Sequence, residues 1–515
     1  MDLAELKAKW FIDTSDTKAF PPQTRHPEAI IQDHSDGNLV TPLIDGENIM
    51  GYFDERMEEL SIVDDPSQSE LWLAAMGIEQ VRLRGLYGEA QDAINKIFNA
   101  LDAGVSVSFL ASGQANLAQM SKRFIKQLIV KGGHGALDNR FPFASGHHQK
   151  FYITYKPDND WEAVVSSADF FEARWDTREH LAENPNRPGG PTHEVAVMVK
   201  GPATMEIAAT FAERWNDLRT SKDTDPPISR ALPTEIKTEP GKYGPHSVQV
   251  LRSYPMMKKG GYSWSDVGEY TVWASYINAI KQAQTYIYIE DQYLYPLGDP
   301  PYIYGEASVK QETDFVYQLG EALKRGVDVV CLVPERNNSI PKHYENQQRR
   351  RATEYLHNIA QYTPGAGRFV VTKLFIGGKD VTIHSKVMLV DDEFALIGTA
   401  NICQRSIAYI TEIHVGIVDA ENVFTRDLRL SLWQEHMELD ASDSLLDPRE
   451  AVGLFAVEVV GGNGRLAPYP VTRYRFEFPY RLLMNRIIDP YSGPERKQLY
   501  SSNSKSLPSN TDCSS

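Results

Sequence analysis

Helical spacing of apolar side chains and short unbroken apolar runs alternate along most of the chain. Residues 93–112, AINKIFNALDAGVSVSFLAS, show the pattern clearly. Apolar positions three and four apart from Ile94 to Leu101 mark one face of a helix, Gly104 is placed to end that helix, and an apolar strand follows. Repeated alternation of this kind predicts an α/β protein.

The same design returns in the second half of the chain, at residues 315–334, FVYQLGEALKRGVDVVCLVP. Phe315, Leu319 and Leu323 fall on one helix face, and Gly326 precedes an apolar strand. The segments ALDAGVSVSFL and ALKRGVDVVCL align without a gap. Because one such pair is common in α/β folds, it indicates a duplication only together with the motifs described below.

Changes in composition divide the chain. Residues 221–246 are rich in proline and charge and lack an apolar period, so we expect a linker between a first half at 1–220 and a second half at 247–440. A C-terminal appendage is expected at 441–490. Residues 491–515 are dominated by serine, asparagine, proline and charge, which predicts a disordered tail.

Length and composition restrict the class of protein. A chain of 515 residues, 42% of them hydrophobic, can bury a large core. The net charge of −16 lacks the basic excess of a protein that binds mainly nucleic acid, so no nucleic-acid partner is expected. The three cysteines, Cys331, Cys403 and Cys513, are too few and too scattered for a disulfide framework or a zinc-ligand cluster.

The N-terminal sequence lacks the pattern of a signal peptide, and no stretch approaches the ~20 apolar residues of a transmembrane segment. We therefore expect a cytoplasmic or peripheral membrane protein, with export by a route without a signal peptide left open. A monomer is expected, because the duplication supplies both halves of a site within one chain.

Two histidine-lysine pairs carry the candidate chemistry. IHSKVMLVDD contains His384, Lys386 and Asp391 in the spacing HxKxxxxD, and HHQKFYITY contains His148 and Lys150. Residues two apart in a strand face the same way, so each pair can project into one site. A lone His-x-Lys is usually a solvated strand face, but two copies, each downstream of the same helix-glycine-strand unit, predict a phosphate site.

A short turn of small and polar residues follows each pair. Ser167, Ala168 and Asp169 stand in the first half where Thr399, Ala400 and Asn401 stand in the second. His147, beside His148, has no lysine two residues on and is interpreted as structural.

These segments resemble the phospholipase D superfamily, whose hallmark is a duplicated HxKxxxxD motif. ARWDTREH, THEVAVMVKGPATMEIAATFAERWN, YIYIEDQYL and HSKVMLVDDEFALIGTANICQRS resemble phospholipase D of the eukaryotic type, and together they cover roughly residues 40–440. Two departures stand out: Tyr155 replaces the aspartate of the first motif, and Ser166-Ser167 replaces the usual glycines. Since that aspartate supports the motif in the family, the tyrosine bears on local structure more than on chemistry.

The resemblance implies an α/β fold of two similar halves, each a mostly parallel sheet flanked by helices, related by a pseudo-twofold axis with the active site between them. It also implies a phosphohistidine mechanism in which His148 attacks phosphorus and His384 acts as the acid. Lys150 and Lys386 would neutralise the phosphate oxygens, and Asn401, Ser167 and Thr399 would donate hydrogen bonds to them. No metal and no cofactor is required.

Histidines in such roles need a partner that fixes the tautomer and stabilises the imidazolium. Glu194 and Glu412 are the candidates, because each lies in a short strand after its motif, where the family places an acidic residue that pairs with a catalytic histidine. An exposed strand carboxylate is the alternative. Asp169 would repel phosphate unless it holds a lysine.

The function expected from this resemblance is hydrolysis of a phospholipid headgroup ester, of the phosphatidylcholine type, to phosphatidic acid at a membrane surface, with headgroup transfer to small alcohols as a side reaction. A nuclease or another soluble phosphodiesterase would use the same motifs. A catalytically inactive lipid-binding or scaffold protein is the third possibility. Residues 254–264, YPMMKKGGYSW, could provide apolar and basic contacts with a bilayer, or could pack in the core or form an ordinary loop.

Overall fold

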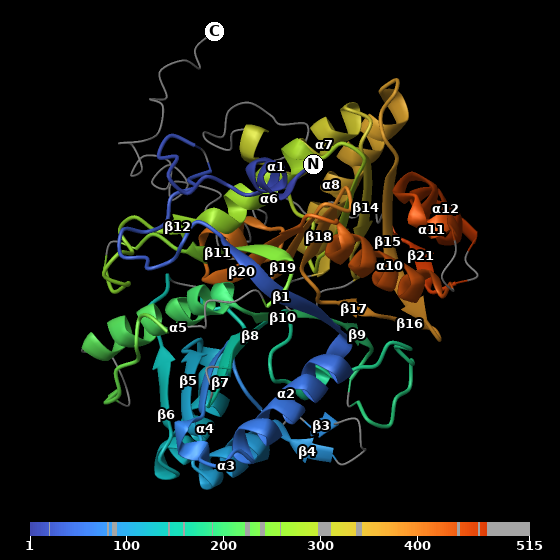
Figure 1. The fold of residues 1–515 in the computed structure, drawn as a ribbon. Coiled ribbons are helices and arrows are strands. Elements are labelled where there is room, and N and C mark those ends of the chain that lie inside the picture. The colour runs from blue at the N-terminus through green and yellow to red at the C-terminus, as the bar shows by residue number, and fades with distance from the viewer. Residues whose placement is uncertain are drawn as a thin grey trace.

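The structure is a computed structural model that describes residues 1–19, 21–79, 82–84, 90–142, 145–157, 160–187, 189–221, 227–236, 243–257, 259–296, 311–335, 342–439, 443–461 and 464–470. Helices and strands alternate through most of this part of the chain (Figure 1). The expected α/β class is confirmed.

The first half contains a series of strands and helices. Their bounds are β1 (Ser35–Ile44), α2 (Asp45–Ser61), β2 (Glu70–Ala75), α3 (Ala93–Ala103), β5 (Ser106–Ser112), α4 (Ala115–Val130), β6 (His134–Asp138), β7 (Phe151–Lys156), β8 (Asp160–Ser166), β10 (Val195–Lys200) and α5 (Pro202–Thr220).

The second half presents the same series in the same order. Its members are β11 (His246–Tyr254), α6 (Thr271–Gln282), β13 (Tyr286–Glu290), α7 (Phe315–Lys324), β14 (Asp328–Leu332), α8 (Lys342–Tyr362), β15 (Phe369–Ile376), β18 (Val387–Val390), β19 (Phe394–Gly398), β20 (Glu412–Asp419) and α10 (Val423–Met437).

Shorter elements complete the described chain. They are α1 (Leu3–Trp10), η1 (Pro66–Gln68), β3 (Arg82–Arg84), β4 (Ala90–Asp92), η2 (Glu172–Arg174), β9 (Thr192–His193), β12 (Glu269–Tyr270), η3 (Gln311–Thr313), β16 (Lys379–Asp380), β17 (Thr382–Ile383), α9 (Gln404–Ala408), α11 (Asp443–Leu446), α12 (Pro448–Gly461) and β21 (Leu466–Pro468).

The predicted helix-glycine-strand unit is present twice. Helix α3 ends at Gly104, whose φ of 112° is a left-handed conformation that glycine adopts without strain, and β5 begins two residues later. After α7, Gly326 adopts a φ of 86°, and β14 follows. The repeated sequence pattern therefore corresponds to a repeated local structure.

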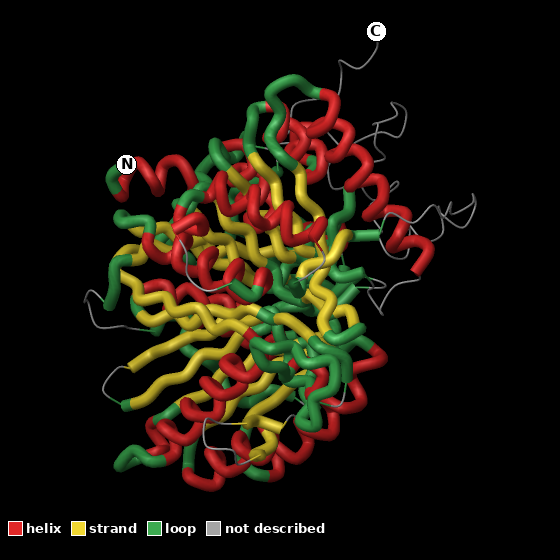
Figure 2. Tube along the Cα trace, turned by 90° about the vertical axis from the view of Figure 1, so that its right-hand side faces the viewer, coloured by secondary structure: helices red, strands yellow, loops and turns green. Residues whose placement is uncertain are grey.

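Hydrogen bonds join the strands of both halves into one sheet. The neighbours run β6-β5-β2-β7-β8-β10-β1 in the first half and β11-β20-β19-β18-β13-β14-β15 in the second, and β1 pairs with β11 between them. Figure 1 accordingly shows β1 and β10 between the strands of the first half below and those of the second half above. In Figure 2 the helices lie outside this central run of strands.

The expected parallel order holds for only part of each half. β2, β5 and β6 are parallel to one another, and so are β13, β14 and β15. Within each set of three, a helix connects one strand to the next, which allows the two strands to run in the same direction. The strands that follow the motifs are joined by short connections and pair antiparallel. The sheet is therefore mixed.

Three large apolar clusters fill the core. One packs α2, α3 and α4 against the first-half strands, and a second packs α1, α6, α7 and α8 against the second-half strands. The third contains side chains of α5 and α10 together with strands of both halves, such as Val197 and Val415. This shared cluster fixes the position of one half against the other.

The predicted linker and the predicted C-terminal appendage both pack against the two halves where the structure describes them. In the predicted linker 221–246, the described residues 227–236 contain no helix or strand and pack three apolar side chains against the shared cluster: Ile228, Leu232 and Ile236. In the predicted appendage 441–490, β21 extends the sheet by pairing with β15. Residues 471–490 and the predicted disordered tail at 491–515 lie outside the described residues.

The segment proposed to contact a bilayer is partly buried. Tyr262 and Trp264 are 4% and 3% exposed, and the Trp264 ring stacks on His26 with centroids 4.2 Å apart. The aromatic part of the bilayer hypothesis is therefore wrong, because these rings pack inside the fold. Among the described residues, no helix has the length and apolar character needed to cross a membrane.

Candidate functional site

The two histidine-lysine pairs lie directly before equivalent strands. His148 and Lys150 precede β7, and His384 and Lys386 precede β18, so the pairs stand at strand entrances rather than within strands. The backbone N–H of His148 donates to the carbonyl of Thr411 at 3.0 Å. Each motif is thus hydrogen-bonded to a segment of the other half, since His384 N–H donates in the same way to His193 O at 2.9 Å.

The two predicted glutamates pair with the histidines crosswise. His148 Nδ1 lies 3.0 Å from Glu412 Oε2, and His384 Nδ1 lies 2.9 Å from a carboxylate oxygen of Glu194. Each glutamate therefore serves the histidine of the other half. With Nδ1–H donating to a carboxylate, the neutral imidazole carries its lone pair on Nε2, which is the tautomer that a nucleophile or base requires.

Hydroxyl groups hold both glutamates in place. Thr399 Oγ1 donates to Glu412 Oε2 at 2.6 Å and accepts from the backbone N–H of Ile413. Ser167 Oγ donates to Glu194 and accepts from the N–H of Val195 in the same manner. The expectation that Ser167 and Thr399 donate to phosphate is therefore not what the structure shows, because each hydroxyl proton is already directed at a carboxylate.

Each lysine contacts the backbone of its own motif. Lys150 Nζ donates to His148 O at 2.9 Å, and Lys386 Nζ donates to His384 O. The carboxylate of Asp169 lies 3.5 Å from Lys150 Nζ and pairs with it. This pairing is the condition under which a carboxylate here would not repel a phosphate.

The second half places its carboxylate differently. Asn401 occupies the position of Asp169, and its buried Oδ1 has no hydrogen-bond partner within the described chain. Two carboxyl groups act on Lys386 instead: Glu194 and, more weakly, Asp291 oppose the fall in the pKa of Lys386 that burial causes. Asp291 also accepts a hydrogen bond from Ile402 N–H at 3.0 Å, and burial raises the pKa of Asp291 itself to about 8. Each lysine thus has one nearby aspartate, supplied from a different strand end in each half.

Burial dominates the electrostatics of the site. It lowers the pKa of His148 and of His384 well below the usual value, and the positive charges of Lys150 and Lys386 act in the same direction. It also lowers the pKa of Lys386 to about 7 and raises that of Glu412 to about 8. Both histidines are therefore neutral near neutral pH, and the site favours added negative charge.

Asp391, the aspartate of the second motif, lies away from these groups. Its carboxylate accepts hydrogen bonds from three consecutive backbone N–H groups, those of Gln284, Thr285 and Tyr286, at 2.7–2.9 Å. Asp391 was a catalytic candidate as part of the second motif, but these contacts give it the supporting role that the resemblance implies for the motif aspartate. It lies five positions beyond Lys386, about 16 Å along the extended chain, and it serves as a cap for the start of β13.

Tyr155 occupies the equivalent place in the first half. It pairs with Glu70 at the start of β2, as Asp391 does with the start of β13, and its ring packs on Trp161 with centroids 4.5 Å apart. The N–H groups of Gln68 and Ser69 donate to the carbonyls of Asp65 and Pro66 instead. The 3-10 turn therefore satisfies two of the three backbone donors that an aspartate would cap, which accounts for the tolerance of tyrosine at this position.

Sequence reasoning missed three residues of the site. Arg174 Nε lies 3.6 Å from Glu194 Oε1, and Ser406 Oγ donates to Glu412 Oε1 at 2.8 Å. Asp291 is the third. Arg174 and Asp291 stand inside the segments ARWDT and YIYIED, which carried the family resemblance, whereas nothing in the sequence distinguishes Ser406 from other serines.

Comparison with known proteins gives two matches to family models. Residues 160–299 match "Phospholipase D", and residues 276–429 match "Cardiolipin synthase, PLD-like domain". The two matches cover the glutamates and the second histidine-lysine pair, whereas His148 and Lys150 lie before the first of them.

Curated relatives are similar at low identity. Phospholipase D alpha 1 of Nicotiana tabacum is 24% identical over 56% of this chain and 49% of its own length. Phospholipase D1 of Mus musculus is 26% identical over 51% of this chain and 28% of its own length. The chain thus spans about half the length, or less, of these relatives. Among solved structures, phosphatidylserine synthase of Haemophilus influenzae Rd KW20 has a TM-score of 0.48 at 13% identity, covering 83% of this chain and 95% of that one.

Replacing Asp391 with alanine should destabilise the fold and leave the histidine-lysine geometry unchanged. The substitution removes the acceptor of three backbone N–H groups, so we expect a loss of roughly 2–4 kcal/mol in the free energy of unfolding. Urea unfolding monitored by circular dichroism measures it. Tyr155→Phe, at the equivalent position, should stay within about 0.5 kcal/mol, and equal effects of the two substitutions would contradict the capping role.

Binding of a phosphate monoanion should weaken as the pH rises through about 7, where Lys386 loses its proton in the free protein. A bound anion raises the pKa of this lysine, so the binding energy it contributes is complete at low pH and is lost as the pH rises. Calorimetry with a non-hydrolysable phosphonate monoester, whose charge is constant, should give up to about tenfold weaker binding per pH unit.

The Lys386→Met variant is the matched comparison. It should bind this ligand weakly at about pH 6 and lose less affinity than the wild type up to about pH 8, because Glu412, whose pKa burial raises to about 8, still titrates in this range. A wild-type affinity that does not change over this range would refute the assignment.

Proposed function

The chain belongs to the phospholipase D superfamily, and on this basis we propose that it is a phosphodiesterase that hydrolyses headgroup esters of phospholipids. The products are phosphatidic acid and the free alcohol. Transfer of the phosphatidyl group to small alcohols in place of water is the side reaction that a covalent intermediate allows.

The observation that carries the proposal is the pair of crosswise histidine-glutamate contacts. His148 with Glu412 and His384 with Glu194 provide two oriented imidazoles, one from each half. Two such rings with two buried lysines suit in-line displacement at phosphorus, where one ring attacks and the other protonates the leaving oxygen.

In the proposed first step, His148 Nε2 forms a bond to phosphorus as the bond from phosphorus to the headgroup oxygen breaks. His384 Nε2–H gives its proton to the departing alkoxide. Because burial lowers the pKa of His384 in the free protein, the negative charge of the bound phosphodiester is what raises that pKa and lets the ring hold the proton until transfer.

In the second step, His384 accepts a proton from water while the oxygen of that water forms a bond to phosphorus. The bond between phosphorus and His148 breaks, and both rings return to their starting states. Lys150 and Lys386 neutralise the non-bridging oxygens throughout, and Asn401, in the turn after the second motif, donates to one of them.

Phospholipid is preferred to nucleic acid as the substrate for two reasons. The net charge of −16 disfavours a polyanionic partner, and the curated relatives named above are phospholipases D. A nuclease or other soluble phosphodiesterase, and an inactive lipid-binding protein, are the alternatives that the assay below separates.

Purified protein should release choline from phosphatidylcholine vesicles and leave labelled single- and double-stranded DNA uncut in parallel reactions. His148→Ala should lower turnover at least about a thousandfold, whereas His34→Ala, a partly exposed histidine beside Asp33, should be neutral. Cleavage of DNA in preference to vesicles would identify a nuclease. Absence of turnover on both substrates would identify a non-catalytic protein.

The roles of the two histidines can be separated with an activated ester. A p-nitrophenyl leaving group needs no acid, so His384→Ala should still release a burst of nitrophenol and form an adduct at His148, detected by mass spectrometry of the modified peptide. His148→Ala should give neither. A burst from His148→Ala with the adduct on His384 would reverse the assignment.

A further inference from the structure

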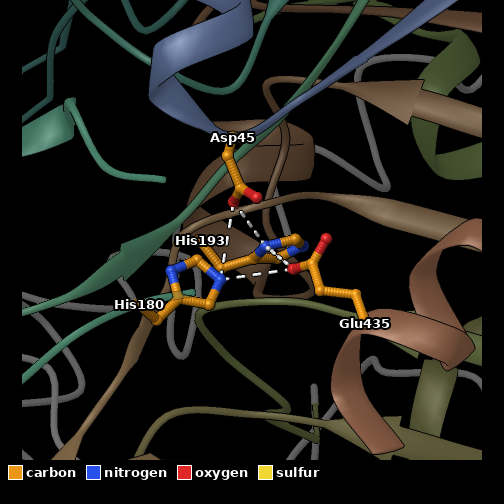
Figure 3. A group of neighbouring side chains, drawn as sticks. All are labelled: Asp45, His180, His193 and Glu435. Atoms are coloured by element: carbon orange, nitrogen blue, oxygen red, sulfur yellow. Dashed lines mark hydrogen bonds and ion pairs between the residues drawn. The ribbon is translucent and has the colours of Figure 1, made fainter. Parts of the chain in front are cut away.

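A second cluster of titratable side chains lies behind the histidine-lysine site. Asp45, His180, His193 and Glu435 converge on one point (Figure 3), and all four are buried. Asp45 begins α2 and His193 ends β9 in the first half, whereas Glu435 lies in α10 of the second. The cluster therefore joins the two halves.

We propose that this cluster binds one Zn²⁺ as a structural ion, with Asp45 Oδ1, His180 Nε2, His193 Nδ1 and Glu435 Oε1 as its four ligands. These atoms all lie within 4.8 Å of one another. Nitrogen and carboxylate oxygen donors are ligands that zinc accepts in tetrahedral sites. The proposal is independent of the reaction assigned to the neighbouring site.

Four of the six distances between ligand atoms are close to those around a tetrahedral ion. His193 Nδ1 lies 2.8 Å from Asp45 Oδ1 and 3.3 Å from Glu435 Oε1. His180 Nε2 lies 3.2 Å from Glu435 Oε1 and 3.6 Å from Asp45 Oδ1. Bonds of 2.0–2.1 Å at tetrahedral angles place neighbouring ligand atoms about 3.3 Å apart, which is close to the mean of these four values.

The outer nitrogen of each imidazole contacts a further carboxylate, as in many metal centres. His180 Nδ1 lies 3.0 Å from Asp176 Oδ2, and Arg187 donates to the other oxygen of Asp176. His193 Nε2 lies 3.1 Å from Glu290 Oε2. A carboxylate on the outer nitrogen fixes the tautomer in which the inner nitrogen faces the ion.

Two further features set Asp45 apart from an ordinary buried carboxylate. Its Oδ1 contacts the two histidines, whereas its Oδ2 is buried without a hydrogen-bond partner among the described residues, so the hydrogen bonds of the protein do not fully satisfy this group. Asp45 and His180 also adopt left-handed backbone conformations, with φ of 66° and 46°. Such conformations are uncommon for residues other than glycine and persist where the surroundings demand a particular side-chain position.

Protons are the alternative occupants of the cluster. Both ring nitrogens of His180 and of His193 face carboxyl groups, so without an ion either each ring carries two protons or a facing carboxyl group is protonated. Zn²⁺ would replace the two inner protons with the same total charge, and binding would release them. The surrounding carboxylates therefore suit either occupant electrostatically, and metal content distinguishes them.

The ion would help to position the backbone of the neighbouring histidine-lysine site. His193 supplies the carbonyl that accepts from His384 N–H at 2.9 Å, and Asp45 N–H donates to Glu194 O at 2.8 Å. With all four ligands from the protein, the ion would have no open position for substrate. It would stabilise the backbone that carries Glu194 and faces His384.

The test is the metal content of the full chain, produced without a metal-affinity tag in zinc-supplemented medium and desalted over chelating resin. Mass spectrometry of the elements should find about one zinc per chain. Asp45→Asn and Glu435→Gln, which keep the side-chain volume, should lower the zinc content at least about tenfold. Glu206→Gln, a buried carboxylate of α5 outside the cluster, should retain it.

A second measurement, on the wild-type chain, tests the proposal even if the variants fail to fold. Cells grown with cobalt in place of zinc should give protein with the strong visible absorption of four-coordinate Co²⁺, which Zn²⁺ removes on exchange. Wild-type protein with less than about a tenth of an equivalent of any divalent transition metal would overturn the proposal and leave protons in the cluster. Full zinc content in both ligand variants would also overturn it, because the ion would then lie elsewhere.

Discussion

Each motif histidine depends on a carboxylate that its own half does not contain. The contacts of His148 with Glu412 and of His384 with Glu194 cross the junction between the halves, so neither half alone can orient its imidazole. The same crossing occurs in the backbone, where each motif is hydrogen-bonded to the segment before the other half's glutamate. Close docking of the halves through β1, β11, α5 and α10 is therefore a requirement of the site as well as of the core.

Burial of the two lysines favours the binding of an anion beside them. Lys150 and Lys386 are 2% and 0% exposed, and both have lowered pKa values because burial outweighs the nearby carboxylates. A buried cation without full compensation is costly, and an anionic phosphate relieves that cost when it binds. The rigid glutamates and hydroxyls hold the groups in position beforehand, which is the form of preorganisation that favours charge development in a transition state.

The two halves have diverged while keeping the same local requirements. The start of β13 is capped by Asp391, and the start of β2 by the 3-10 turn before it, which leaves Tyr155 free to pack on Trp161. Lys150 has Asp169 after its motif, and Lys386 has Asp291 at the end of β13. The capping of a strand start and the carboxylate near a lysine thus come from different chain positions in the two halves. The absence of a motif residue at its usual position therefore does not imply that its role is lost.

Much of the fold and part of the site follow from the sequence. Helical and strand periodicity predicted the repeated units around Gly104 and Gly326, because both signals are local and each residue's neighbours in the chain determine them. The spacing of the two His-x-Lys pairs predicted the groups that are proposed to carry the chemistry. Only the tertiary structure decided how these groups are partnered. It directed Ser167 and Thr399 to glutamates, placed Asp391 far from the histidines, buried Trp264, and assembled Asp45, His180, His193 and Glu435 from segments up to several hundred residues apart. Such contacts depend on how the two halves dock, and no local pattern in the chain records that docking.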